Sequence, residues 1–284
     1  MLDQSLDYYL ADKPDADLGG KLIAEACRSL KYNRDEYLAQ IGNETIISKL
    51  VETAALWQSP DYKLRKLALA ADPKDTGFPR EVLAAGLDAC FKEWTQEKFF
   101  SLLNQEIGDP TRLQSYGSLS GRSLAMVHGP KLIAQLAPGN LPVPIFQSIA
   151  FGLLLRSAQF VKCATGKSLL PRLFGHSLHY VDPGLASALE IAEWKGGNEK
   201  LESELYNEAD CILATGNDST LESVRKYLPL NKKFIGYGNR ISFGYVEQLA
   251  NEVMGTQTII SRAADDVIAW NQQGCLSPQV IYIE

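Results

Sequence analysis

Two patterns of hydrophobic and polar positions divide the chain. Up to about residue 125, apolar residues recur every three or four positions, which is typical of amphipathic helices. We predict helices over residues 22–30, 35–57, 63–70 and 82–103, with a break at residues 108–110. Asp17 is the predicted cap of the first helix. Residues 1–125 therefore form a predicted helical N-terminal region.

From about Lys131, short apolar runs alternate with helical patterns. The predicted strands are residues 132–136, 159–162, 192–194, 211–214 and 233–236, and the predicted helices between them are 142–155, 168–180, 200–206 and 219–227. Such alternation indicates a parallel sheet with helices on both faces, and ligands bind such sheets at the carboxyl ends of the strands. We therefore predict an α/β fold with a Rossmann-like nucleotide-binding domain over residues 126–245.

Beyond Gly238 the alternation loosens. The pattern predicts a helix over 265–270, a turn over 271–274 and a strand over 279–283, which ends one residue before the chain does. Because an apolar strand needs neighbouring strands, we interpret residues 246–284 as the start of a further, incomplete domain.

The composition and charge of the chain exclude some classes of function. Of 284 residues, 45% are hydrophobic, which suffices for a sizeable core. With 28 basic and 34 acidic residues the formal charge is −6, whereas binding to nucleic acid requires a basic surface. No basic signal segment opens the sequence, and the apolar stretch at 149–155 is too short to span a bilayer. We expect a cytoplasmic protein without a nucleic-acid partner or membrane span.

The five cysteines are widely spaced and form no CxxC pair, which argues against a disulfide framework or a zinc ribbon. Cys27 and Cys90 lie in apolar helical patterns, and Cys163 and Cys211 lie at the edges of predicted strands. For these four we expect packing roles.

Cys275 differs from the other cysteines because it follows a turn and precedes a strand. Gly274 permits close approach of the backbone, and adjacent amides can donate to a developing oxyanion. A thiolate at this place can accept an acyl group as a thioester, which divides one difficult transfer into two easier steps. Packing is the alternative role at this point.

Two further patterns match a known type of binding site only incompletely. Gly166-Lys167-Ser168 is similar to the end of a phosphate-binding P-loop, but Val161 stands where that loop needs a glycine. His176 and His179 share a predicted helix face, but no third metal ligand occurs at a suitable spacing. We expect neither a nucleoside triphosphatase nor a metal site.

Several spaced segments together resemble the aldehyde dehydrogenase superfamily. Residues 137–142 resemble the segment whose Asn donates to the oxyanion, and residues 160–162 resemble the following strand, whose Lys contacts the adenosine ribose. Residues 214–217 are similar to the turn that opens a helix over the cofactor, and residues 271–275 to the nucleophile turn.

Within that superfamily the chain resembles the fatty acyl-CoA reductases of bacterial bioluminescence, from about Gly129 to its end. The resemblance implies NADPH-dependent reduction of a long-chain acyl group to an aldehyde, with fatty acyl-CoA or an acyl-transferring protein as donor. It implies a thioester on Cys275, with Asn140 and the Cys275 amide stabilising the oxyanion. The cofactor contacts it implies are Pro138, Lys162, Thr165, Lys167, Thr215, Gly216, Asn217 and Gly238.

Three positions depart from the pattern of the superfamily. Residues 236–239 lack the general-base Glu of oxidising members, which suits an enzyme that keeps its thioester for reduction. Thr165 stands where NAD-preferring members often carry a Glu, and the missing carboxylate permits the 2′-phosphate of NADP. Asp218 is an objection, because the start of that helix usually faces the pyrophosphate.

Family chains continue well beyond the nucleophile, whereas this sequence ends nine residues after Cys275. The resemblance implies that the missing part completes the catalytic domain and forms much of the interface of a homo-oligomer. Two alternatives stay open: an aldehyde or semialdehyde dehydrogenase that works oxidatively, and a truncated cofactor-binding chain without catalysis.

Overall fold

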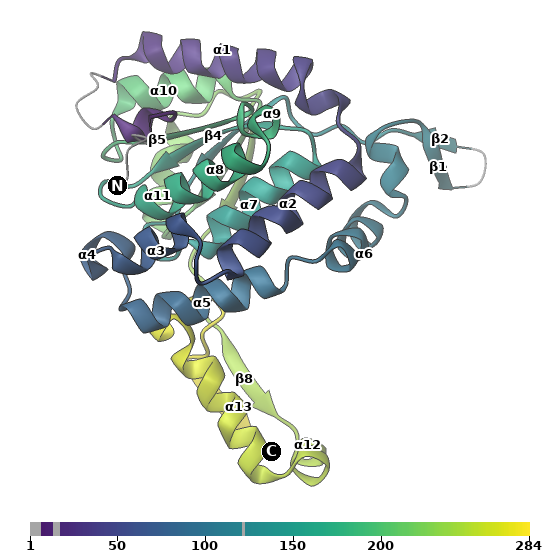
Figure 1. Cartoon of the computed structure of the whole chain (residues 1–284), viewed down its shortest axis with the longest axis vertical. Helices are drawn as coiled ribbons and strands as arrows, with labels where there is room; N and C mark the ends of the chain where they lie inside the picture. The colour runs from purple at the N-terminus through teal and green to yellow at the C-terminus, as the bar shows by residue number, and fades with distance from the viewer. Residues whose placement is uncertain (1–6, 14–17, 121–122) are drawn as a thin grey trace.

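A computed structural model describes residues 7–13, 18–120 and 123–284 (Figure 1). Its central sheet has five parallel strands in the order β5-β4-β3-β6-β7. The strands are β3 (Leu132–Leu136), β4 (Ala158–Cys163), β5 (Leu189–Glu193), β6 (Cys211–Thr215) and β7 (Lys233–Tyr237). The predicted parallel α/β sheet is confirmed. The strand predicted at 192–194 was placed too late, because Glu190 interrupts the apolar run that begins with the buried Leu189.

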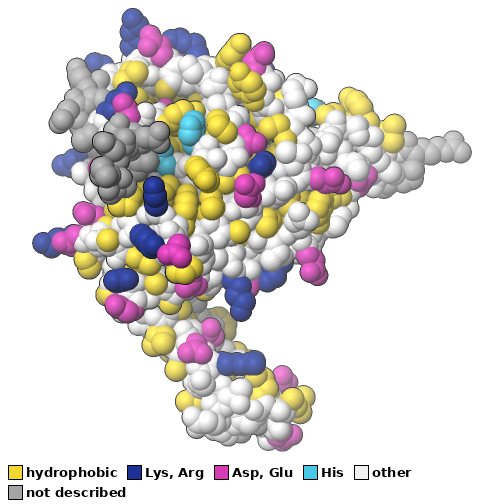
Figure 2. Space-filling model, in the orientation of Figure 1, with side chains coloured by type: hydrophobic (Ala, Val, Ile, Leu, Met, Phe, Trp, Pro, Cys, Tyr) yellow, Lys and Arg dark blue, Asp and Glu magenta, His cyan; other side chains and the backbone are white. Residues whose placement is uncertain are grey.

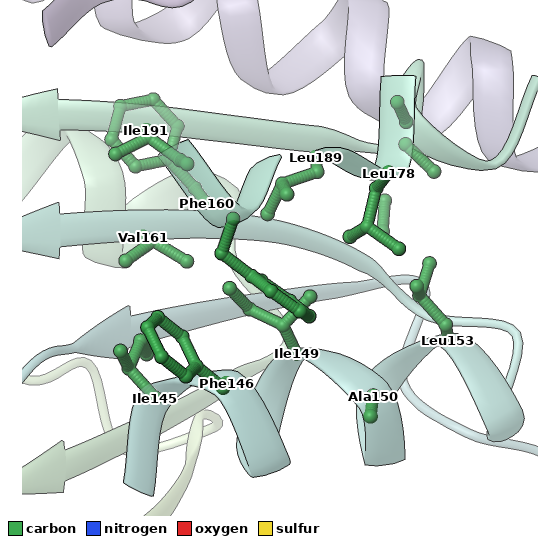
Figure 3. Close-up of a cluster of buried hydrophobic side chains, with 14 of the residues drawn as sticks. Ile145, Phe146, Ile149, Ala150, Leu153, Phe160, Val161, Leu178, Leu189 and Ile191 are labelled. Carbon is green, nitrogen blue, oxygen red and sulfur yellow. The ribbon is translucent and has the colours of Figure 1, made fainter. Parts of the chain in front are cut away.

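Helices cover both faces of this sheet. Right-handed crossovers place α7 (Val143–Leu154) and α8 (Leu169–Val181) on one face. The strand order reverses between β5 and β6, which places α10 (Glu199–Glu208) on the other face, beside α1 (Gly20–Glu36). Figure 3 shows the apolar side chains of α7, among them Phe146 and Ile149, packed toward Phe160 of β4. Burial of these side chains holds the strand ends in place.

The remaining N-terminal helices share one hydrophobic core with the sheet. They are α2 (Asn43–Gln58), α3 (Lys63–Ala70), α4 (Pro73–Thr76), α5 (Arg80–Lys92) and α6 (Gln96–Ile107). Of these, α2, α3 and α4 pack on α8, and α5 and α6 pack in turn on α2. Among the described residues, no helix combines the length and apolar character that a membrane crossing requires. The domain limits at 125/126 and 245/246 stay predictions.

Two helices that were predicted to be continuous are each interrupted in the structure. The helix expected over 35–57 is interrupted at residues 37–42, and the helix expected over 82–103 is interrupted at residues 93–95. At the second break the hydroxyl of Thr95 accepts the N–H of Lys98 and caps a new helix, α6. The cap position of α1 is Gly19, and the predicted cap Asp17 lies outside the described residues.

Two parts project from this body. One is an antiparallel hairpin of β1 (Gly117–Ser120) and β2 (Ser123–Ala125). The other, here called the C-terminal arm (residues 239–284), extends away from the sheet in Figures 1 and 2. The arm contains β8 (Phe243–Val246), α12 (Gln248–Met254), α13 (Thr256–Ile268), the 3₁₀ turn η4 (Ala269–Gln272) and β9 (Val280–Ile283), with β8 and β9 parallel. The helix predicted at 265–270 thus begins much earlier, and the apolar pattern did not predict β1, β2, β8 or α12.

A buried carboxylate fastens the segment before α1 to the rest of the body. Asp12 accepts hydrogen bonds from Arg172 Nε at 2.7 Å and pairs with His176 Nε2 at 2.9 Å. Burial alone would raise the pKa of Asp12, but hydrogen bonds from His176 and from the amides of Tyr9 and Tyr8 outweigh it and lower the pKa to about 2. In the described part of the chain, no three His, Cys, Asp or Glu side chains gather as a metal site. The contact with Asp12 gives His176 a structural role.

The carboxyl group of Glu190, in β5, should make the free energy of unfolding depend on pH. Glu190 Oε1 accepts the amides of Leu10 and Ile191, and burial raises the pKa of its carboxyl from the ordinary 4.5 to about 7. The folded state thus binds this proton more tightly than the unfolded chain does. The stabilisation from this tighter binding is fully present below pH 4.5 and is lost as the pH rises through 7. The loss lowers the free energy of unfolding by about 3 kcal/mol.

Glu190→Gln should remove this loss, because the glutamine keeps the acceptor oxygen without the charge. Urea unfolding at pH 5 and pH 8 measures the difference for both proteins. The expected result is a smaller fall in unfolding free energy for the variant. Equal falls in both proteins would contradict the role of Glu190.

Candidate active site

The residues predicted to contact oxyanion and cofactor lie at one edge of the sheet. Strands β3, β4, β6 and β7 run parallel, so their carboxyl ends meet there. The residues are Pro138 and Asn140 after β3, Lys162, Thr165 and Lys167 at the end of β4, Thr215, Gly216 and Asn217 at the end of β6, and Gly238 after β7. The fold thus brings them together, while their individual roles stay predictions.

Lys162 places a largely buried ammonium group at this edge. Lys162 is only 9% exposed, and its Nζ lies 5.8 Å from the centroid of the Trp194 ring. Burial lowers the pKa of this ammonium, against the opposing effect of the Glu202 carboxylate. Among the described residues no acceptor forms a hydrogen bond with Nζ. An ammonium group without a protein acceptor can donate to a ligand oxygen such as a ribose hydroxyl.

The turn after β4 is held from two sides. The carboxylate of Glu193 accepts the N–H of Gly166 at 2.7 Å and that of Ser168 at 3.2 Å. Lys167 Nζ donates to the carbonyl of Lys74 in α4 at 2.9 Å, which leaves donors of its ammonium for an anion. Thr165 lies exposed on this turn. The turn carries no carboxylate side chain of its own, but the Glu193 carboxylate already accepts two of its amides.

Two polar side chains at the start of α11 (Asp218–Lys226) already accept hydrogen bonds from backbone amides. Asn217 Oδ1 accepts the N–H of Thr220 at 2.8 Å, so Asn217 is the helix cap. Asp218 Oδ1 accepts the N–H of Asn239 at 3.0 Å, which directs this carboxylate toward the loop after β7. A Cβ at Gly238 would lie 2.4 Å from that oxygen, so a side chain there would displace the Asp218 carboxylate. This hydrogen bond directs the Asp218 carboxylate toward the loop but does not remove its charge.

Cys275 is exposed, whereas the other four cysteines are buried as predicted, so its thiol has no packing role. Residues 270–272 before it all have positive φ (53°, 51° and 59°), which is uncommon outside glycine. Asn140 Nδ2 donates to the carbonyl of Gln273 at 3.0 Å, and Ser242 Oγ donates to the carbonyl of Cys275 at 2.6 Å. Asn140 thus contacts the turn that carries Cys275, although the two residues are distant in sequence, and their roles stay predictions.

Trp270 anchors this turn to the body, a contact that the sequence analysis missed. Its ring centroid lies 5.0 Å from that of Phe78, in an edge-to-face arrangement. A Cβ added to Gly86 of α5 would lie 2.2–2.5 Å from atoms of the indole ring. The available signal was a glycine inside a strongly helical pattern, which often marks close packing. Gly86 thus leaves the space that Trp270 occupies.

We expect Gly86→Ala to loosen the C-terminal arm. The added methyl group overlaps the indole ring, so the ring and the turn must shift, at a cost of about 1–3 kcal/mol. Hydrogen exchange over residues 270–284 measures the effect. Gly20→Ala is the matched control, because its nearest non-helical atom is 3.7 Å from the added Cβ. Equal exchange in the two variants would contradict the anchoring role.

The sequence is similar to a known protein family and to curated proteins. A family model described as acyl-CoA reductase (LuxC) matches residues 38–284. The chain is 22% identical over 259 residues to a long-chain acyl-protein thioester reductase of Photorhabdus luminescens, covering 89% of this chain and 52% of that protein. The chain therefore spans about half the length of the curated relatives it matches.

Solved structures with the same fold are aldehyde dehydrogenases. A salicylaldehyde dehydrogenase from Pseudomonas putida G7 gives a TM-score of 0.72 at 12% identity, covering 95% of this chain and 54% of that one. The dehydrogenase GapN from Methanocaldococcus jannaschii, complexed with NADP, gives 0.68 at 13% identity, covering 95% and 56%. The predicted aldehyde-dehydrogenase-like fold is confirmed.

Proposed function

Since the chain belongs to the acyl-CoA reductase (LuxC) family, we propose that it reduces an activated long-chain acyl group to the aldehyde through a thioester on Cys275. The observation that carries this proposal is an exposed Cys275 thiol in a turn that Asn140 contacts. A relative named long-chain acyl-protein thioester reductase supports thioester chemistry. Fatty acyl-CoA is the first donor to test, and an acyl-carrying partner protein is the second.

In the acyl-transfer step the Cys275 thiolate attacks the acyl carbonyl carbon. A bond forms from Sγ to that carbon, the bond to the donor sulfur breaks, and the donor leaves as a thiol after taking up a proton. Meanwhile the Asn140 amide and the N–H of Cys275 donate to the oxygen that carries the negative charge. Each group thus stabilises charge that exists only during transfer.

NADP(H) is the cofactor we assign to the carboxyl edge of the sheet, where the reduced form supplies the hydride that converts the thioester to the aldehyde. Lys162 would hold a ribose hydroxyl with its unpaired ammonium, and the start of α11 at Gly216 would face the pyrophosphate. Thr165 and Lys167 would admit a 2′-phosphate. Pro138, Thr215, Asn217 and Gly238 would shape the surrounding edge.

Reduction is favoured over oxidation by the residue at position 236. Gly236, within β7, stands where oxidising members carry a general-base Glu. Without that carboxylate, water near the thioester is not activated, so hydrolysis does not compete with hydride transfer. A cytoplasmic location and a homo-oligomer remain predictions from the sequence.

The proposed function is tested by aldehyde release. The chain is incubated with NADPH and either long-chain acyl-CoA or an acylated carrier protein, and the aldehyde is trapped as a hydrazone. We expect aldehyde from wild type and none from Cys275→Ala. Aldehyde from the variant would overturn the thioester route, and equal use of NADH would overturn the cofactor assignment. An acyl adduct without aldehyde would identify a chain that accepts acyl groups but does not reduce them.

A further inference from the structure

A separate pocket lies at the opposite edge of the central sheet. It has a volume of about 370 Å³ and lies between the end of α1, the 3₁₀ turns η2 (Leu38–Gln40) and η3 (Pro110–Leu113), and the turn before β4. Its polar lining consists of Arg34, Arg156, His128, Gln40 and Gln114, and none of its lining residues is acidic. Because Arg156 precedes β4 whereas Lys162 lies near its end, this pocket is remote from the candidate active site.

Arg156 is a buried cation whose charge no carboxylate neutralises directly. It is 5% exposed and has a φ of 55°, at the end of a helix where glycine is favoured. Its guanidinium donates to Ile41 O at 3.1 Å, Leu154 O at 3.2 Å and Asn43 Oδ1 at 2.7 Å. All three acceptors are neutral, and within the described chain two of its five N–H donors stay unpaired.

Arg34 adds a second positive charge beside Arg156. Its Nε donates to the carbonyl of Arg156 at 2.8 Å, and its Nη1 pairs with Asp35 at 2.6 Å. Asp35 also binds Lys131 at 3.1 Å, so one carboxylate serves two cations while Arg156 has none. Burial lowers the pKa of Arg156, and the charge of Arg34 lowers it further. The pocket therefore concentrates positive charge on a chain whose net charge is −6.

We propose that this pocket binds a phosphate group, either as the free ion or as part of a phosphate ester. Guanidinium groups match phosphate oxygens with paired N–H donors, and two of them balance a dianion. Gln114 and His128 line the same space and offer further donors. A bound phosphate would supply the acceptors that Arg156 lacks. Its distance from Cys275 makes it an effector or stabilising site and not part of the acyl chemistry.

Calorimetric titration of the full chain at constant ionic strength tests the site, with inorganic phosphate and glycerol 3-phosphate as separate ligands. We expect wild type to bind, and the tighter ligand distinguishes the free ion from an ester. Arg34→Gln should weaken binding about tenfold or more, because it removes charge-assisted hydrogen bonds. Arg34→Lys keeps the charge but not the paired donors, so intermediate weakening is expected and the test survives if Arg34→Gln does not fold.

Arg28→Gln is the matched control. Arg28 lies exposed on the same helix, and its replacement changes the net charge equally. It should leave binding unchanged. Phosphate bound at the cofactor edge would be unaffected by Arg34→Gln as well, so the loss in that variant separates the two sites. Absence of binding by wild type, unchanged binding by Arg34→Gln, or equal weakening by both glutamine variants would overturn the proposal.

Discussion

Cys275→Ala should form no adduct with long-chain acyl-CoA, whereas the wild-type chain should gain the mass of one acyl group. The thiolate is the nucleophile, and Cys275 is the exposed thiol among the five cysteines. Burial raises the pKa of Cys27, Cys90 and Cys163 to about 12, so these groups stay protonated at neutral pH. Intact-mass spectrometry after incubation measures the adduct directly.

Thiol titration gives an independent check of the same assignment. Ellman's reagent should label one thiol rapidly in the native wild type, none in Cys275→Ala, and all five cysteines after unfolding. Cys211→Ala is the matched control, since Cys211 is buried in β6 and should leave the adduct intact. An adduct on Cys275→Ala would place the acyl group elsewhere. No adduct on wild type would contradict acyl transfer by this chain.

Asn140→Ala should slow acyl transfer by about 10²–10³-fold, the usual effect of removing one oxyanion donor. The side-chain amide of Asn140 reaches the carbonyl of Gln273, two residues before the nucleophile. Its loss therefore removes both a donor and a contact that holds the turn. Stopped-flow measurement of thioester formation, with acyl-CoA in excess, gives the rate.

Alkylation by iodoacetamide separates these two effects, because it requires an accessible thiolate but no oxyanion donor. If Asn140 acts as a donor, acyl transfer slows far more than alkylation; parallel slowing would indicate a positioning role alone. Asn33→Ala is the matched control, since Asn33 also donates its amide to a carbonyl, that of Ser187, at 2.9 Å. Acyl transfer at the wild-type rate in Asn140→Ala would contradict any role for this residue.

Local periodicity predicted some elements to the residue and failed at others. The strand 132–136 and the helix 63–70 were predicted with their observed bounds, because each is a short run with clear breaks on both sides. The breaks at 37–42 and 93–95 were missed, since the apolar spacing continues across them and helix caps such as Thr95 decide the boundary. The strand β8 was missed because it is only four residues long and contains Gly244, which weakens a strand pattern.

The sequence by itself determined the order of strands and helices, and with it the edge at which the candidate site lies. Burial of both faces of the central strands and of one face of each helix leaves a local pattern, and parallel strands bring their carboxyl ends together. Only the tertiary structure decided that Asn140 reaches the turn of Cys275, that Gly86 leaves room for Trp270, and that Arg34 and Arg156 share a pocket. Each of these contacts joins residues far apart in the chain. They depend on how helices pack and on how particular backbone angles direct a side chain, which no local spacing of apolar residues encodes.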